Sequence, residues 1–176
     1  FLSFVTPAIE GGSATSDRAG PVIFGAIRHF YTRPLALRDG RIVASVRFQR
    51  EATGVMWTDV FESHDGARTW HFLSRVNDWG APGDLCELAD GRLVCVYGYR
   101  LPPSGIRARA SGDGGRTWGR EIVLRDDGGS WDLGYPRVIE TAPGTLLTVY
   151  YMNRRDDAIQ QNGGVRHIAR TIFTLD

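Results

Sequence analysis

The chain has 176 residues, of which 42% are hydrophobic and 23% charged, and its formal net charge is +1. These values are typical of a globular protein, and they give no charge excess of the kind that draws a protein to nucleic acid or to a membrane surface. No apolar run approaches the roughly 18 residues that a membrane-spanning helix needs.

Three stretches repeat one pattern, in which a strand leads through a tight turn into a second strand rich in β-branched and aromatic residues. They are "RPLALRDGRIVASVRF" from Arg33, "APGDLCELADGRLVCVYGYR" from Ala81 and "YPRVIETAPGTLLTVYY" from Tyr135. Their turn glycines, Gly40, Gly91 and Gly144, are 51 and 53 residues apart. Two turns are Asp-Gly, a strong hairpin signal, and the third is Pro-Gly. A period near 50 without helical patterning predicts the blades of a β-propeller.

Each period provides the strands of one blade, since "GIRARAS" and "GREIVLR" add two more to the second repeat. A propeller closes with about four to eight blades, so a chain with about three is expected to be part of a larger ring, its C-terminal half. The expected division is a blade remnant over 1–30, followed by blades over 31–78, 79–130 and 131–176.

The two cysteines, Cys86 and Cys95, lie symmetrically about the turn at Asp90 and Gly91. A two-residue hairpin loop would set them opposite each other on neighbouring strands. They are then either buried free thiols or a cross-strand disulfide. Their spacing fits no metal site, and neither a metal nor a cofactor is expected.

Two near copies of one motif lie between strands, "SHDGARTW" at 63–70 and "SGDGGRTW" at 111–118. The aspartate is expected to accept hydrogen bonds from turn amides, the glycine to adopt an unusual backbone conformation and the tryptophan to pack between sheets. The residues with these structural roles are Ser63, Asp65, Trp70, Ser111, Asp113, Gly115 and Trp118. Ala67 replaces the second glycine in the first copy, which predicts a looser turn there. His64 is expected to be a solvated turn residue.

This Ser-x-Asp-x-Gly-x-x-Trp pattern resembles the Asp-box (BNR) repeat of sialidases and related propeller proteins. With "GYRLPPSGIRARAS", "DLGYPRVIE" and the closing "RHIARTIFTL", residues 30–176 are similar to the C-terminal half of bacterial sialidase-like proteins. The resemblance implies an all-β fold, a β-propeller of the six-bladed sialidase type with about three blades in this chain. It also implies an exo-alpha-sialidase-like glycosidase, with a glycan or a small acidic sugar as its partner.

The connections between strands alternate between the two faces of such a disc. The Asp-Gly turns and the tryptophan motifs share one face, and longer loops with many charged and aromatic residues share the other. Loops held by a rigid scaffold commonly carry binding sites, so this second face is the candidate. The alternative is a solvated rim. The loop residues concerned are Arg47, Arg50, Glu51, Asp78, Trp79, Tyr99, Arg100, Arg107, Asp127, Trp131, Asp132, Tyr135, Arg154, Arg155, Asp156 and Asp157.

Each period also begins with a residue followed by proline, namely Arg33, Ala81 and Tyr135. A proline at the first position of a strand loses no ladder hydrogen bond, and inner strands line the central channel of a propeller. Arg33 and Tyr135 are therefore expected at the mouth of one funnel. The alternative is that Tyr135 packs between blades.

In sialidases a tyrosine paired with a glutamate attacks the anomeric carbon, an aspartate is the acid/base, and arginines hold the substrate carboxylate. The resemblance implies Tyr135 as nucleophile, with Glu87 as the candidate partner and the acid/base outside this chain. The candidate carboxylate-binding residues are Arg33, Arg100, Arg107 and Arg137. Two departures from the family are Pro136, where a serine is expected, and the missing residue between Arg33 and its proline. Arg107 has a second interpretation, with Arg109, as one face of a strand paired with acidic neighbours.

Two other functions fit the same pattern. A polysaccharide lyase, or another glycosidase for uronic-acid glycans, would use Tyr135 as acid/base and keep the arginines. A non-catalytic carbohydrate-binding propeller would need neither, because a fold does not determine a function.

Overall fold

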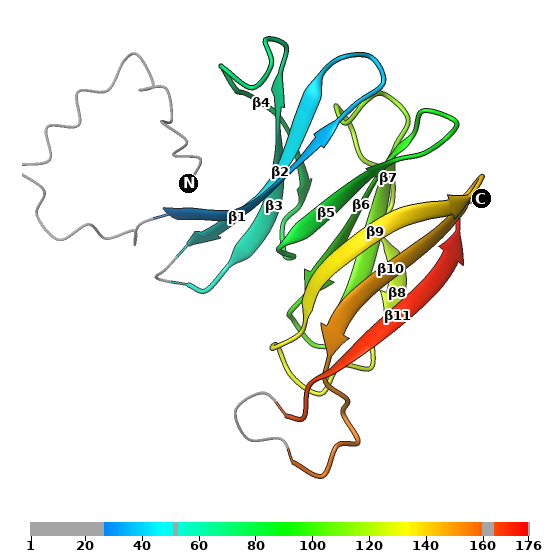
Figure 1. Ribbon diagram of the computed structural model, residues 1–176. Helices are drawn as coiled ribbons and strands as arrows, with labels where there is room; N and C mark the ends of the chain where they lie inside the picture. Colours follow the sequence, from blue (N-terminus) through cyan, green and yellow to red (C-terminus); the bar gives the residue numbers. More distant parts are fainter. Residues whose placement is uncertain (1–26, 51–52, 160–163, 176) are drawn as a thin grey trace, which may run out of the picture.

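The computed structural model describes residues 27–50, 53–159 and 164–175, and this part of the chain is all-β (Figure 1). It holds eleven strands, arranged in two four-stranded sheets and one three-stranded sheet. Within each sheet, consecutive strands are antiparallel neighbours, as in the blades of a propeller. Within the same residues there is no helix long and apolar enough to cross a membrane.

The first sheet contains β1 (Ile27–Ala36), β2 (Ile42–Arg50), β3 (Met56–Ser63) and β4 (His71–Asn77). The second contains β5 (Gly83–Glu87), β6 (Leu93–Tyr99), β7 (Gly105–Ser111) and β8 (Ile122–Arg125). The third contains β9 (Gly134–Ala142), β10 (Thr145–Met152) and β11 (His167–Thr174). β1 begins inside the segment 1–30 that the sequence had set apart, and the rest of that segment lies outside the described residues.

The three sheets lie side by side in chain order, with the second between the other two (Figure 1). Strand β5, the first of its sheet, contacts β1 and β2 on one side and β9 on the other. The first strands of neighbouring sheets therefore come together, and they bring residues about 50 positions apart in the sequence into contact.

Strand β6 shows why these sheets stack. Leu93, Cys95 and Tyr97 point into the apolar core shared with the first sheet, and Val94 and Val96 point into the core shared with the third. Successive strand residues face opposite sides of a sheet, so a strand covered on both sides needs an unbroken apolar run. That is the composition of "RLVCVYGY".

The β5–β6 turn corrects the predicted pairing of the cysteines. Leu88 N donates to Arg92 O at 2.8 Å, and Gly91 has a φ of +89°, so the loop has three residues rather than two. The longer loop shifts the register, and Cys86 pairs with Val94 while Cys95 pairs with Leu85. The prediction that the cysteines face each other is wrong. Both are free thiols, on opposite faces of the sheet.

The two tryptophan motifs form the same hydrogen bonds. Asp65 Oδ1 accepts from Arg68 N and Thr69 N at 3.0 and 2.9 Å. Asp113 Oδ1 accepts from Arg116 N and Thr117 N, both at 2.9 Å. The hydrogen bonds from the threonines lower the pKa of both aspartates.

The looser first turn is not observed. Ala67 N donates to Ser63 Oγ at 2.9 Å, as Gly115 N does to Ser111 Oγ. Ala67 instead adopts a left-handed φ of +68°, a conformation that costs about 1–2 kcal/mol for a residue with a Cβ.

Trp118 joins the first two sheets. Its Nε1 donates to Ser74 Oγ on β4 at 2.9 Å, and its ring packs against their shared core. The second tryptophan motif is thus part of the contact between sheets.

Candidate functional site

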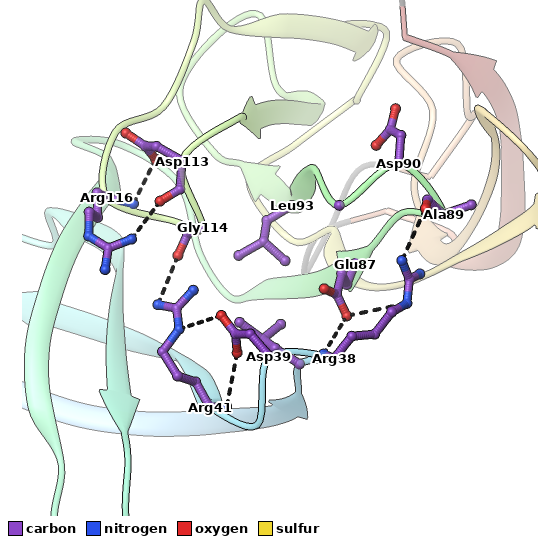
Figure 2. A pocket seen from close by; sticks show the side chains of 12 residues that line it. Arg38, Asp39, Arg41, Glu87, Ala89, Asp90, Leu93, Asp113, Gly114 and Arg116 are labelled. Atoms are coloured by element: carbon purple, nitrogen blue, oxygen red, sulfur yellow. Dashed lines mark hydrogen bonds and ion pairs between the residues drawn. The ribbon is translucent and has the colours of Figure 1, made fainter.

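The two ends of the sheets carry different kinds of cavity. At one end, the β1–β2 turn, the β5–β6 turn and the second tryptophan motif surround a cavity of about 610 Å³. Figure 2 shows it with Arg38, Arg41, Glu87 and Asp113 around it, and hydrogen bonds and ion pairs join many of these side chains to one another. At the other end, the longer loops line cavities of about 200 and 690 Å³. Most charged side chains around the first cavity are therefore already paired with other groups of the protein.

At the second end, Tyr135 is the centre of an aromatic cluster. Its ring meets the edge of Tyr31 at 4.9 Å between centroids and stacks on Tyr151 at 5.6 Å. Tyr135 and Tyr31 both have left-handed backbone conformations, with φ of +52° and +57°. Strained non-glycine residues persist where the surrounding structure fixes them, often at functional sites. The two tyrosines come from β9 and β1, in different sheets.

Two arginines flank this cluster. Arg47 Nη1 donates to Tyr135 Oη at 3.3 Å, and Arg100 Cζ lies 5.7 Å from the centroid of the Tyr135 ring. Burial of Arg47, followed by the like charge of Arg100, lowers the pKa of Arg47. Burial and a hydrogen bond with Tyr31 raise the pKa of Tyr135, although the two arginines oppose this. At neutral pH the site therefore presents a neutral phenol beside two cations.

Arg100 is held rigidly. Its Nε donates to Ala81 O at 3.2 Å and its Nη1 to Trp131 O at 2.9 Å. Its third nitrogen, Nη2, is buried and has no acceptor in hydrogen-bonding geometry within the described part of the chain, although an interaction with Arg100 opposes the rise in the pKa of Tyr151. A guanidinium fixed in this way keeps its positive charge beside the Tyr135 ring, and that charge favours an anionic ligand there.

One carboxylate reaches the cluster indirectly. Tyr151 Oη donates to Asp132 Oδ1 at 2.5 Å, and Arg166 Nε donates to Asp132 Oδ2 at 2.6 Å. Burial pushes the pKa of Asp132 upward, but the hydrogen bonds from Tyr151 and Arg166 outweigh it and leave that pKa lowered. Burial and the bond to Asp132 raise the pKa of Tyr151 to about 12. Asp132 is therefore ionised, and Tyr151 is neutral, at neutral pH.

A second carboxylate, Asp84 on β5, links all three sheets. Arg33 Nε on β1 lies 3.3 Å from its Oδ1, and Arg137 Nη1 on β9 lies 3.7 Å away. Val138 N donates to its Oδ2 at 2.9 Å. Arg33 and Arg137 were both expected to bind a substrate carboxylate, and each contacts this internal one.

Two predicted site residues lie away from Tyr135. Glu87 is at the opposite end of β5, where it accepts from Arg38 N at 3.0 Å and lines the cavity of Figure 2. Arg107 is only 3% exposed, donates to the carbonyls of Pro103 and Arg125, and forms an ion pair with Glu121 at 3.5 Å. These contacts correspond to the second interpretation of Arg107. The structure brings neither residue to the tyrosine cluster.

The sequence did not single out Tyr31, Tyr151 or Asp84 for the site. Tyr151 closes the run "TLLTVYY", where an aromatic residue is ordinary strand composition. Asp84 gave one usable signal, an acidic residue at the start of an inner strand between two repeats that carry arginine there. Tyr31 gave no sequence signal, because the feature that places it is a shift in the β1–β2 pairing register between Phe30 and Arg33.

No protein-family model matches the chain, and no curated protein matches it either. Solved structures do. A protein of unknown function from Dyadobacter fermentans is 32% identical with a TM-score of 0.69, over 85% of this chain and 39% of its own. The GH93 alpha-L-arabinofuranosidase of Fusarium graminearum is 22% identical with a TM-score of 0.62, over 83% and 45%. A polysaccharide lyase, PL25 ulvan lyase, is 14% identical with a TM-score of 0.59, over 81% and 38%.

The chain thus spans less than half of each of these proteins. Such a likeness shows the fold, and it confirms the all-β, β-propeller class predicted from the repeats. The number of blades in the complete ring and the sialidase type stay predictions.

Proposed function

We propose that the protein containing this chain is a carbohydrate-active enzyme that binds an acidic sugar over Tyr135. The observation that carries this proposal is the pair of guanidiniums, of Arg47 and Arg100, beside the phenol of Tyr135. Arginine suits a carboxylate because its planar fork bonds both oxygens. Proteins of similar fold named as an arabinofuranosidase and a polysaccharide lyase support an action on glycans.

The first reaction we propose is sialidase-like hydrolysis with retention. Tyr135 Oη attacks the anomeric carbon, the glycosidic bond breaks, and the leaving oxygen takes a proton from an acid that we expect outside this chain; water then hydrolyses the bond between the tyrosine and the sugar. Arg47 stabilises the negative charge that develops on the phenolic oxygen as its proton leaves. A neutral phenol suits an anionic sugar because it does not repel the substrate carboxylate. The phenol proton needs an acceptor. Among the described residues no hydrogen bond joins Tyr135 to a carboxylate, since Asp132 bonds Tyr151, whose ring only stacks on that of Tyr135. We therefore expect the acceptor among residues that the structure does not describe.

A second candidate, a uronate lyase, is favoured by one specific contact. Arg47 on β2 donates a hydrogen bond to Tyr135 Oη. Its positive charge lowers the free-energy cost of forming a phenolate there. As a phenolate, Tyr135 would remove the proton next to the uronate carboxylate while Arg100 binds that carboxylate. The bond to the leaving glycosidic oxygen then breaks, a carbon–carbon double bond forms, and the leaving oxygen takes a proton.

The two reactions are separated by their products. The full-length protein is incubated with a fluorogenic sialoside, with polygalacturonate and with arabino-oligosaccharides. Release of the fluorophore supports hydrolysis, and ultraviolet absorbance from an unsaturated sugar supports the lyase. Binding without turnover would indicate a carbohydrate-binding propeller and refute the enzyme.

Tyr135→Phe is the decisive variant. It removes the reacting hydroxyl and keeps the ring contacts, so turnover should fall at least about a hundredfold. Tyr99→Phe is the matched control, because the Tyr99 ring lies 4.8 Å from Arg107 and outside the cluster. Activity that survives Tyr135→Phe, or that appears only on arabino-oligosaccharides, would contradict the proposal.

A further inference from the structure

Two exposed tryptophans stand at the same end of the sheets as Tyr135. Trp79, in the β4–β5 connection, is 41% exposed, and Trp131, in the β8–β9 connection, is 62% exposed. A cavity of about 200 Å³ is lined by both, and its other walls are Gly54, Met56, Arg100 and Leu101. Large apolar side chains gathered at an exposed cavity mark a binding site more often than bare surface. Among the described residues that line it, Arg100 supplies the one charged group.

A second cavity, of about 690 Å³, adjoins the first, because Arg100 and Trp131 line both. Its other walls come from loop residues 102–104 and 128–130 and from Arg155. The two cavities are therefore neighbours, with Arg100 and Trp131 in the wall of both, and together they are called the trough.

Arg100 connects this trough to the tyrosine cluster. Its Cζ lies 5.9 Å from the ring of Trp131 and 5.7 Å from the ring of Tyr135. Since its Nε and Nη1 are fixed on the carbonyls of Ala81 and Trp131, the same guanidinium faces both places. A ligand that touches Arg100 in the trough is thus next to a ligand that lies over Tyr135.

We infer that the cavity between Trp79 and Trp131 is a sugar-binding subsite, which holds the unit linked to the acidic sugar at Tyr135. This inference rests on the proposed function and adds a substrate class, an oligosaccharide of at least two linked sugars instead of a free monosaccharide. A volume of 200 Å³ is below the roughly 300–1,000 Å³ of pockets for drug-sized ligands, and it suits a single sugar ring.

The chemistry of the walls fits a pyranose. One face of such a ring presents C–H groups with partial positive charge, which pack on the negative face of an aromatic ring. Its hydroxyls point outward along the ring edge, where Arg100 can donate hydrogen bonds to them. Tryptophan provides the largest aromatic face for this contact and holds it at low entropic cost, since few bonds of its side chain rotate.

The test compares long and short ligands on the full-length protein by tryptophan fluorescence titration. The pairs are sialyllactose against free sialic acid, and tetragalacturonate against galacturonate. In the pair that binds, the longer sugar should bind at least about tenfold more tightly, a difference of about 1.4 kcal/mol. Trp131→Ala and Trp79→Ala should each remove most of that advantage. Trp79→Ala should leave the affinity for the monosaccharide unchanged.

Phe72→Ala is the matched control, because Phe72 on β4 is 59% exposed, nearly as much as Trp131. It should keep the advantage of the longer sugar. Equal affinity for the long and the short ligand in the unsubstituted protein, or an advantage that survives both tryptophan variants, overturns the subsite while Tyr135-dependent turnover stands. If neither pair binds or is turned over, the proposed function itself is wrong, and the subsite falls with it.

Discussion

Asp84 ties together the first strands of all three sheets, so its removal should destabilise the whole stack. The residue is 7% exposed and lies on β5. It accepts a hydrogen bond from Val138 N on β9 at 2.9 Å, and it pairs with Arg33 on β1 and Arg137 on β9. Asp84→Ala removes all three contacts at once and leaves the buried amide of Val138 without its acceptor.

The expected cost follows from how buried each partner is. A buried hydrogen bond to a charged acceptor is worth about 1.5–3 kcal/mol. The side chains of Arg33 and Arg137 are 44% and 53% exposed, so solvent screening leaves each ion pair about 0–1 kcal/mol. Asp84→Ala should therefore lower the free energy of unfolding by about 2–4 kcal/mol. Asp84→Asn should lower it by about 1–2 kcal/mol, because an amide oxygen still accepts from Val138 N.

Urea unfolding of the purified protein, followed by tryptophan fluorescence, measures the loss. Asp156→Ala is the matched control, since Asp156 and its partner Arg154 are 69% and 54% exposed. It should change the free energy of unfolding by no more than about 0.5 kcal/mol. An equally small effect of Asp84→Ala would refute the idea that this carboxylate holds the inner strands together.

The remaining predictions concern the turns of the two tryptophan motifs and one ionisable group. Ala67→Gly should stabilise the protein by about 0.5–1 kcal/mol, because glycine removes the strain of a left-handed φ. Gly115→Ala should cost about 1–2 kcal/mol, since it adds that strain and brings a Cβ to 3.3 Å from two leucine side chains; urea midpoints measure both, and shifts of the same sign would contradict the argument. For Tyr151, the pKa is about 12 in the fold and about 10 in the unfolded chain, so its contribution is complete below pH 10 and is lost between pH 10 and 12. As the pH rises from about 10 to about 12, Tyr151→Phe should therefore lose less stability than the unsubstituted protein, and an equal loss would place the titration elsewhere.

The sequence was sufficient to predict the sheets because their signals are local. Turn glycines about 50 residues apart and runs such as "RLVCVYGY" specify hairpins and buried strands without long-range information. Local signals of this kind do not specify the register in which two strands pair. An Asp-Gly pair occurs both in a two-residue loop and in the last two positions of a three-residue loop, and only the second is present at Gly91. One extra loop residue moved Cys86 and Cys95 to opposite faces.

The candidate site was predicted in part for a related reason. Alternating connections place Tyr135 and Arg100 at one end of the sheets, and that end carries the tyrosine cluster. Glu87 lies on the inner strand that the sequence analysis assigned to it, but at the end of that strand away from Tyr135. Arg107 lies on the face of its strand that is buried within the sheet stack, where it pairs with Glu121. The role of Asp84 arises from contacts among three strands about 50 residues apart, which no local pattern encodes.

At this end of the sheets, carboxylates are paired with arginines, but Arg100 is not paired with a carboxylate of the described residues. This difference favours an anionic ligand. Asp84 and Asp132, two of the carboxylates at this end, are each in contact with at least one arginine. Arg100, in contrast, contacts carbonyls and aromatic rings and forms no ion pair within the described residues, although its charge lowers the pKa of both Asp132 and Arg47. A carboxylate bound between these arginines would relieve their repulsion. A neutral sugar in the same position could accept hydrogen bonds but would leave that repulsion in place, so under the proposed function substrate charge, more than ring shape, should determine which glycans are preferred.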